Sequence, residues 1–177
     1  MRNVFGFVLS MLVLFGAAAP ASASDDIKAN MLRAGDLRCL ALNIYFEARG
    51  EPVLGKIAVG HVVLNRVDNV RFPQRVCNVI RQGGAKRRNR CQFSWWCDGR
   101  SDRPRDAKAW KEAQFVAGLI RIGATTDPTA GALWYHAVHV KPGWSTRLNR
   151  QSKIGKHIFY TKKPRKTTQV ARRPDGA

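Results

Sequence analysis

Two consecutive segments with apolar residues at helical spacing constrain the fold of this chain most. In the first segment, the apolar residues that recur every three or four positions are Leu37, Leu40, Ala41, Ile44 and Ala48. Asp36 can cap this helix, which runs to about Arg49, and Gly50 can end it. Pro52 suits the first turn of a second helix that runs to about Val67. The pattern therefore predicts two helices, each with one buried face.

The rest of the chain predicts a third long helix and several short elements. Asp106 can cap a helix that runs through about Ile122, and residues 76–80 predict a short helix. Residues 91–96 predict a short strand, and residues 132–140 predict a strand or an extended loop. Residues 154–160 form the last segment that we expect to be ordered. We therefore expect a mostly α-helical domain (α+β with a few short strands) over residues 36–161.

Both ends of the chain predict segments outside this domain. An apolar run from Val4 to Phe15 follows a positive start, and Ala21-Ser22-Ala23 fits a cleavage pattern of small residues. This predicts a signal peptide over residues 1–23 and a polar lead-in over residues 24–35. The alternative is a retained membrane anchor, but the run is shorter than the roughly 20 residues that span a bilayer. We expect an exported protein, located in the periplasm, the cell wall or the exterior.

The four cysteines of an exported chain favour disulfides. Cys91 and Cys97 are close in sequence and flank an aromatic segment, so they are the favoured local pair. Cys39 and Cys77 would then form the second pair. Three pairings are possible, and the sequence does not choose among them. A zinc site is disfavoured because the chain contains no C-x-x-C spacing.

The formal net charge of +19 predicts an anionic partner or surface. Export argues against nucleic acid and favours peptidoglycan carboxylates, lipid head groups or acidic surface polymers. Basic residues are concentrated in an exposed loop over residues 81–90 and in a tail over residues 162–177. We expect the tail to be disordered. We expect this loop and tail to hold the protein on an anionic wall or envelope surface. A secreted nucleic-acid-binding protein is the alternative that charge alone suggests.

Glu47 is the first candidate for chemistry. It is one of only three glutamates, and it follows Ile44 by three positions and Leu40 by seven, at the flank of the buried stripe. A carboxyl group there borders the core on one side and a cleft on the other. Desolvation then raises its pKa toward the range that a general acid needs near neutral pH. The alternative is a surface ion pair among Glu47, Arg49 and Glu51.

The sequence around Glu47 resembles a known family. Tyr45-Phe-Glu-Ala-Arg-Gly-Glu51, Leu64-Asn-Arg66, Cys91-Gln-Phe-Ser-Trp-Trp-Cys97 and Ile154-Gly-Lys-His-Ile-Phe-Tyr160 are similar to blocks of the spore-cortex-lytic (SleB/CwlJ-type) cell-wall hydrolase family. The likeness covers about residues 37–160. It implies a lysozyme-like single domain that acts on peptidoglycan glycan strands as a lytic transglycosylase or muramidase. It also implies that Glu47, the first glutamate of its motif, is the catalytic acid.

The carboxylates favour a mechanism with one glutamate. Hydrolysis by two carboxylates needs a partner across the scissile bond. Glu51 follows an interrupted helix, and the other candidates, Asp98, Asp102 and Asp106, lie in what looks like a solvated loop. We predict that Glu47 protonates the oxygen between N-acetylmuramic acid and N-acetylglucosamine, and then acts as base while the C6 hydroxyl closes an anhydro ring. The alternatives are a water-using muramidase and a non-catalytic peptidoglycan-binding module.

Aromatic and amide side chains predict the sugar contacts, because sugar rings stack on aromatic faces and hydrogen-bond to polar tips. The predicted substrate-binding residues are Gln92, Phe93, Ser94, Tyr135, His136 and Trp144, with Trp95 and Trp96 as further aromatic candidates. His136 and His139 would share a face only on a helix, whereas this region looks extended, so we expect no metal site. No cofactor is implied, and we expect a monomer.

Overall fold

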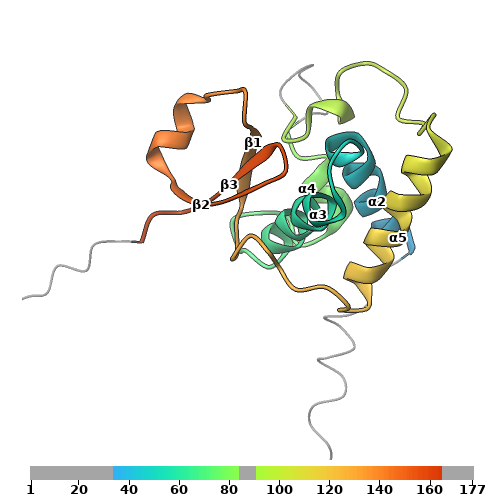
Figure 1. Ribbon diagram of the computed structural model, residues 1–177, viewed down its shortest axis with the longest axis horizontal. Coiled ribbons are helices and arrows are strands. Elements are labelled where there is room, and N and C mark those ends of the chain that lie inside the picture. The colour runs from blue at the N-terminus through green and yellow to red at the C-terminus, as the bar shows by residue number, and fades with distance from the viewer. Residues whose placement is uncertain (1–33, 84–90, 165–177) are drawn as a thin grey trace, which may run out of the picture.

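The computed structural model describes residues 34–83 and 91–164. In chain order the elements are α2 (Ala34–Ala48), α3 (Val53–Val67), α4 (Val76–Ile80), the 3₁₀ turn η1 (Ser94–Trp96), α5 (Ala107–Arg121), β1 (Trp134–Ala137), the 3₁₀ turn η2 (Gly143–Arg147), β2 (Asn149–Ile154) and β3 (His157–Thr161). Figure 1 shows the helices grouped together, with the sheet and η2 forming a lobe beside them. None of the helices in these two ranges is long and apolar enough to cross a membrane.

Several predicted segments lie outside the described residues. These are the signal peptide, the lead-in up to residue 33, residues 84–90 of the basic loop, and the tail from residue 165 onward. The signal peptide and the export that it implies therefore remain predictions from sequence.

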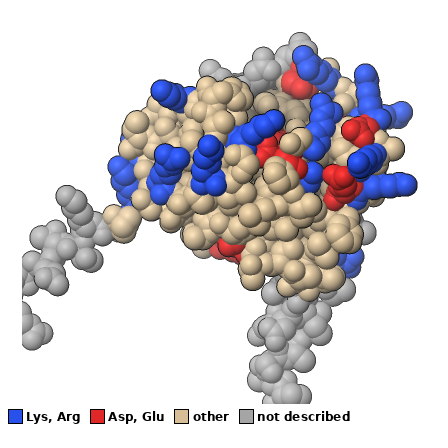
Figure 2. Space-filling view, viewed as in Figure 1, with Lys and Arg blue, Asp and Glu red and all other residues tan. Residues whose placement is uncertain are grey.

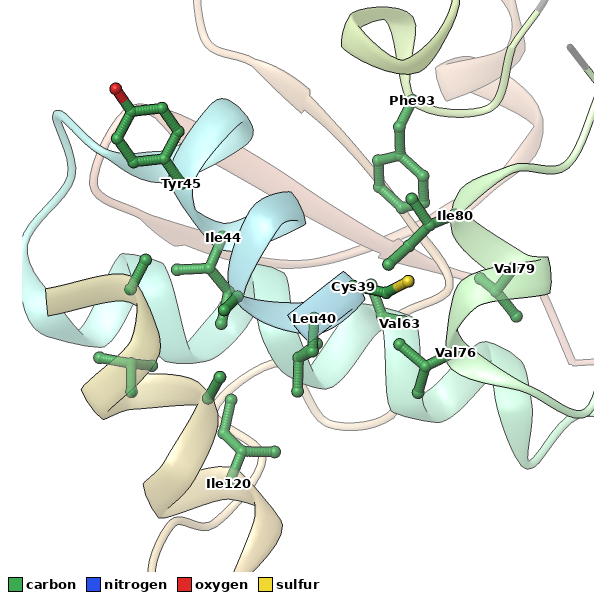
Figure 3. Close-up of a cluster of buried hydrophobic side chains, with 14 of the residues drawn as sticks. Cys39, Leu40, Ile44, Tyr45, Val63, Val76, Val79, Ile80, Phe93 and Ile120 are labelled. Atoms are coloured by element: carbon green, nitrogen blue, oxygen red, sulfur yellow. The ribbon is translucent and has the colours of Figure 1, made fainter. Parts of the chain in front are cut away.

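The centre of the helical part is α2. Its predicted stripe is buried apart from Leu37, which is partly buried, and Leu40 and Ile44 are fully enclosed. Figure 3 shows both side chains lying among those of the neighbouring helices, including Val63 of α3, Val76 of α4 and Ile120 of α5. Burying a side chain of this size stabilises the fold by about 1.5–3 kcal/mol. The stripe therefore fixes the position of α2, whose last turn carries Glu47.

The sheet is antiparallel, with strand order β1-β3-β2. Phe159 of the central strand is fully buried against Val59 and Val62 of α3. Tyr135 of β1 lies opposite Phe159 in the register, and residues that lie directly opposite share a face of the sheet. Tyr135 therefore also faces the helices, and we call this side the inner face of the sheet.

Most predicted helices are present with small shifts at their ends. The third helix, α5, follows its predicted cap, because the side chain of Asp106 accepts a hydrogen bond from Ala109 N at 3.0 Å. The short helix over residues 76–80 is confirmed. The cap predicted at Asp36 is wrong, since Asp36 lies inside the first turn of α2. Its carboxylate instead accepts a hydrogen bond from the backbone N–H of Cys77, at 3.2 Å.

The short segments were predicted less well. The strand predicted over residues 91–96 is wrong: Ser94–Trp96 form a 3₁₀ turn inside the loop that the Cys91–Cys97 disulfide closes. The predicted extended segment over residues 132–140 contains β1, and the predicted last ordered piece contains β3. β2 was not predicted, because its residues Asn149–Ile154 are mostly polar and exposed.

Both favoured disulfides are present. Cys39 of α2 is bonded to Cys77 of α4, with the two Cα atoms 5.4 Å apart. The Cα atoms of Cys91 and Cys97 are 6.1 Å apart. The first disulfide fastens α4 to the central helix, and the second shapes the loop next to Glu47.

Candidate active site

Glu47 lines a cavity between the helices and the sheet. The cavity has a volume of about 250 Å³. Its walls come from α2, α3, the disulfide loop, β1 and β3, and the lining residues are Glu47, Arg66, Cys91, Gln92, Phe93, Ser94, Tyr135, His136, Ala137 and His157. Glu47 is the only carboxylate among these lining residues. The cavity thus presents one acid to any ligand that enters it.

The carboxyl group of Glu47 is held in a partly desolvated position. Burial raises its pKa above the usual glutamate value, while the Tyr135 hydroxyl and the charge of Arg66 act in the opposite direction. The hydroxyl of Tyr135 donates a hydrogen bond to Glu47 Oε2 at 3.0 Å. A raised pKa keeps more of this carboxyl protonated near neutral pH, as a general acid requires.

Tyr135 orients the acid from the sheet. Its ring packs edge-on against His157, with 5.1 Å between centroids, and is tilted against Phe159 at 5.6 Å. Burial and the neighbouring charge of Glu47 raise the pKa of Tyr135 well above its usual value. The hydroxyl therefore stays protonated and acts as a fixed hydrogen-bond donor to Glu47.

Arg66 brings a buried positive charge to the same cavity. Its guanidinium carbon lies 5.5 Å from the ring centroid of Phe72 and 5.1 Å from that of Phe93, and its Nε donates to Leu133 O at 2.7 Å. Burial lowers its pKa to about 10, so it remains charged at neutral pH. Its Nη1 has no hydrogen-bond partner among the described residues, and can donate to a bound acceptor group.

The alternative interpretation, a surface ion pair among Glu47, Arg49 and Glu51, is contradicted by the structure. Glu51 is only 8% exposed, and its Oε2 accepts a hydrogen bond from Lys156 N at 2.8 Å. The guanidinium of Arg49 lies over the ring of Tyr45 instead, 5.5 Å from the centroid. Glu51 therefore ties the start of α3 to the hairpin between β2 and β3, and it does not line the cavity.

His157 lies beside Glu51 and also lines the cavity. Its Nδ1 is 4.0 Å from Glu51 Oε2. Burial lowers the pKa of His157, partly opposed by the charge of Glu51, so the imidazole is predominantly neutral at pH 7. A neutral imidazole in the cavity wall can accept or donate a hydrogen bond to a sugar hydroxyl.

A second cavity continues from the first. Its volume is about 420 Å³, and it shares Arg66, Gln92 and Tyr135 with the cavity of Glu47. Its other lining residues are Trp134, Trp144, Arg147 and Leu148. Because they share Arg66, Gln92 and Tyr135, we treat the two cavities as one cleft that passes from Glu47 to η2.

A third cavity, of about 450 Å³, is larger but lies beside other faces of α2. It is lined by Tyr45, Phe46 and Arg49, and also by Asp98 and Asp102. Glu47 is not among its lining residues. We place the site in the smaller cavity because Glu47, Tyr135 and Arg66 meet there. Two of the possible partner carboxylates that we disfavoured, Asp98 and Asp102, therefore line a different cavity from Glu47, and the third, Asp106, caps α5.

Comparison with known proteins places this fold in a family. Residues 50–160, more than half of the chain, match the model of the Cell Wall Hydrolase family. The chain belongs to the cell wall hydrolase family. The matched range begins three residues after Glu47 and includes Glu51, Arg66 and Tyr135.

The relatives of this cell wall hydrolase include spore cortex-lytic enzymes. It is 36% identical to the enzyme of Bacillus cereus (strain ATCC 14579) over 125 residues, which cover 70% of this chain and 43% of that protein. It is 32% identical to the enzyme of Bacillus subtilis (strain 168) over 146 residues, which cover 80% of this chain and 43% of that protein. The aligned residues thus span about two-fifths of the length of these curated relatives.

Solved structures support the fold of this cell wall hydrolase. The catalytic domain of the Bacillus cereus SleB protein superimposes with a TM-score of 0.57 at 32% identity, covering 75% of this chain and 94% of that chain. The catalytic domain of the germination-specific lytic transglycosylase SleB from Bacillus anthracis gives the same TM-score and identity, and 98% of that chain is covered. The predicted fold class, a mostly helical, lysozyme-like domain with a few short strands, is confirmed.

The structure of this cell wall hydrolase brings most of the predicted site residues together. Gln92, Phe93, Ser94, Tyr135 and His136 line the cavity of Glu47, and Trp144 lines the second cavity. The imidazole of His136 also stacks on Tyr160, and its Nε2 is 2.9 Å from the Tyr160 hydroxyl. Two other aromatic candidates are elsewhere: Trp95 is buried and stacks on Phe46, and Trp96 lies under Arg81.

Four residues that line the cavity of Glu47 were not among the predicted catalytic or substrate-binding residues: Arg66, Cys91, Ala137 and His157. Arg66 lay in the Leu64-Asn-Arg66 block, and a charge on the apolar face of a helix was a usable signal, because an arginine there must find a buried partner. Among the described residues, no group of three His, Cys, Asp or Glu side chains is placed to hold a metal ion.

Proposed function

We propose that this chain cleaves the glycan strands of peptidoglycan between N-acetylmuramic acid and N-acetylglucosamine, and that it does so as a lytic transglycosylase. The observation that carries the proposal is the environment of Glu47. A single carboxyl group with a raised pKa lies in a cleft and accepts a hydrogen bond from Tyr135. Membership of the cell wall hydrolase family supports the substrate class.

The proposed reaction uses Glu47 twice. The protonated carboxyl donates its proton to the glycosidic oxygen while the bond from that oxygen to C1 of N-acetylmuramic acid breaks. The Glu47 carboxylate then accepts the proton of the C6 hydroxyl of the same sugar, whose oxygen attacks C1. The products are a glycan end with a 1,6-anhydro ring and a free N-acetylglucosamine hydroxyl, and no water is consumed. Glu47 finishes the cycle protonated.

The carboxylates of the chain favour this route over hydrolysis. A two-carboxylate hydrolase places its second carboxyl about 5–9.5 Å from the first. Here Glu51 is engaged by the backbone of the β2–β3 hairpin, and Glu47 is the only carboxylate that lines its cavity. Residues 84–90, which the structure does not describe, contain no Asp or Glu. Water-using hydrolysis by a muramidase is the alternative reaction.

The remaining site residues have proposed roles that follow from their positions. We propose that Gln92, Ser94 and His136 hydrogen-bond sugar groups near Glu47, and that Trp144 provides a stacking face in the second cavity. Phe93 is only 2% exposed, so it acts through its packing against Arg66. From the sequence we also propose export to the periplasm or cell wall, where the basic loop and tail hold the protein on its anionic substrate.

The test is mass spectrometry of the soluble products that the wild type and Glu47→Gln release from purified sacculi. We expect anhydro-muramic ends from the wild type and a loss of roughly 10²–10⁴-fold in rate from Glu47→Gln. Asp68→Asn, which removes an exposed carboxylate at the end of α3, is the matched control and should retain full activity.

Three outcomes would contradict parts of the proposal. Reducing muramic acid ends would replace transglycosylation by hydrolysis. Full activity of a folded Glu47→Gln variant would remove Glu47 from the mechanism. Binding to sacculi without any soluble product from the wild type would favour a non-catalytic binding module.

A further inference from the structure

The charges of the chain are distributed unevenly between its two parts. From Pro128 to Pro164 the chain contains seven Lys and Arg residues and no Asp or Glu. All seven are exposed: Lys141, Arg147, Arg150, Lys153, Lys156, Lys162 and Lys163. Among the described residues that precede Pro128, nine are acidic and thirteen are basic. Figure 2 shows Lys and Arg side chains spaced over the lobe that contains the sheet and η2.

A bulge in β2 places two of these cations on one face of the sheet. Arg150 lies opposite Tyr160 and Lys153 lies opposite Ile158, with a register shift between Arg150 and Ser152. In a regular strand, residues three apart face opposite sides. The extra residue at the bulge shifts the alternation of side chains by one position. Arg150 and Lys153 therefore face the same side, away from the helices. We call this side, opposite to Phe159, the outer face of the sheet.

The cationic lobe is continuous with the cleft of the proposed active site. Arg147 and Trp144 of η2 line the second cavity, which shares Arg66 and Tyr135 with the cavity of Glu47. β2 begins two residues after Arg147, so Arg150 follows directly from this end of the cleft. A polymer lying in the cleft therefore leaves it beside the cations of η2 and β2.

We propose that η2 and the outer face of β2 dock the free carboxylates of the peptide stems that peptidoglycan carries on its muramic acid residues. This inference rests on the proposed function, because it takes the polymer in the cleft to be peptidoglycan. The hydroxyl and N-acetyl groups of the glycan are neutral, whereas the stems carry carboxylates. The segment that contains η2 and β2 has seven cations and no acid, so it complements the stems and not the sugar backbone.

The position of the lobe distinguishes this partner from other polyanions. A membrane surface or a nucleic acid would be attracted by the cations without any need for a cleft beside them. Stem peptides are attached to the sugars that the cleft would hold, so their carboxylates lie within reach of its rim. The expected consequence is preference for sacculi with free stem carboxylates over sacculi in which these carboxylates have been converted to neutral amides.

The test compares two double variants, both made in full-length chains that carry Glu47→Gln so that the substrate stays intact. One is Arg150→Gln/Lys153→Gln on the sheet, and the matched control is Lys108→Gln/Lys111→Gln on the exposed side of α5. Each removes two exposed charges. Binding is measured by co-sedimentation with sacculi, with sacculi whose stem carboxylates have been converted to neutral amides, and with anionic phospholipid vesicles.

We expect the sheet variant to bind untreated sacculi about fivefold more weakly at low salt, as estimated for two exposed charge contacts. We expect no change on amidated sacculi and no change for the α5 variant. Equal losses on both kinds of sacculi, equal losses for both variants, no loss, or a loss confined to vesicles would each overturn the proposal. Product release by the chain with Glu47 intact is scored separately, so a failure of glycan cleavage is distinguishable from a failure of stem docking.

Discussion

Gly155 offers a quantitative test of how the hairpin is tied to the start of α3. It lies in the turn between β2 and β3 with φ +57°, in the left-handed region that disfavours a side chain. A Cβ at this position would overlap Glu51 Oε2 and lie 3.1 Å from Glu51 Cδ. The same carboxylate is buried and accepts the Lys156 N–H. Gly155→Ala therefore incurs two costs, one conformational and one steric.

The two costs have separate magnitudes. A non-glycine residue in the left-handed region costs about 1–2 kcal/mol. Displacing the Glu51 carboxylate weakens a hydrogen bond to a charged group, worth about 1.5–3 kcal/mol. Reduced freedom of the unfolded chain returns about 0.4–1 kcal/mol. We expect Gly155→Ala to lower the free energy of unfolding by about 2–4 kcal/mol, measured by urea denaturation with both disulfides intact.

Gly131→Ala is the matched control for the conformational cost. Gly131 has φ +79°, and a Cβ there would meet nothing within 4 Å. It should lose only about 1 kcal/mol, the left-handed cost less the unfolded-state gain. If both variants lose the same free energy, the close approach of Gly155 to Glu51 contributes nothing, and the tie between α3 and the hairpin is not a stabilising contact.

Two further predictions concern the acid and the disulfides. Tyr135→Phe removes the hydrogen bond that favours ionised Glu47, so the pKa of Glu47 rises further and the acid stays protonated to higher pH. The alkaline limb of kcat/KM against pH should therefore move to higher pH. The maximal rate should fall roughly tenfold, because Glu47 is no longer oriented by the hydroxyl. Movement of this limb to lower pH would contradict the role of Tyr135. Cys39→Ala/Cys77→Ala removes the disulfide between residues 38 positions apart and should lower the free energy of unfolding in urea by about 4 kcal/mol. Removing the Cys91–Cys97 disulfide, with a separation of 6, should lower it by about 2 kcal/mol. Equal losses would refute the loop-length argument.

The helices could be predicted from sequence because their periodicity is strong and their ends are marked. The buried stripe of α2 and the cap of α5 at Asp106 followed from residue spacing alone. The sheet could not be predicted in the same way. β2 is an edge strand with a polar sequence, and its bulge interrupts the alternation by which strands are recognised. The segment over residues 91–96 looked strand-like because its aromatic content raised β propensity, whereas the short disulfide loop favours a turn.

The site was predicted in part, and the missing part consists of long-range contacts. The position of Glu47 at the flank of the α2 stripe, with the family resemblance, indicated one acid beside a cleft. The donor to that acid, Tyr135, is 88 residues away in sequence, and the carbonyl that holds Arg66 is 67 residues away. Neither separation leaves a local pattern. A buried arginine in an apolar helix face predicts that a partner exists, but the partner is chosen by the packing of β1 against α3.

The sheet has two proposed roles, orienting Glu47 and docking peptide stems, and we expect that each can be perturbed without the other. Because alternate residues face opposite sides, β1 and β3 direct Tyr135 and His157 inward to the cleft, while Arg150 and Lys153 of β2 face outward. Outward charges are screened by solvent and salt, so their removal has little effect on the pKa of Glu47. Arg150→Gln/Lys153→Gln should therefore change the dependence of cleavage on salt and on peptide stems while leaving the pH profile unchanged. Tyr135→Phe should shift the pH profile while leaving the dependence on salt and on peptide stems unchanged. A variant of the outer face that shifts the pH profile would mean that the two faces are electrostatically coupled, and that substrate docking and acid strength are not separable in this fold.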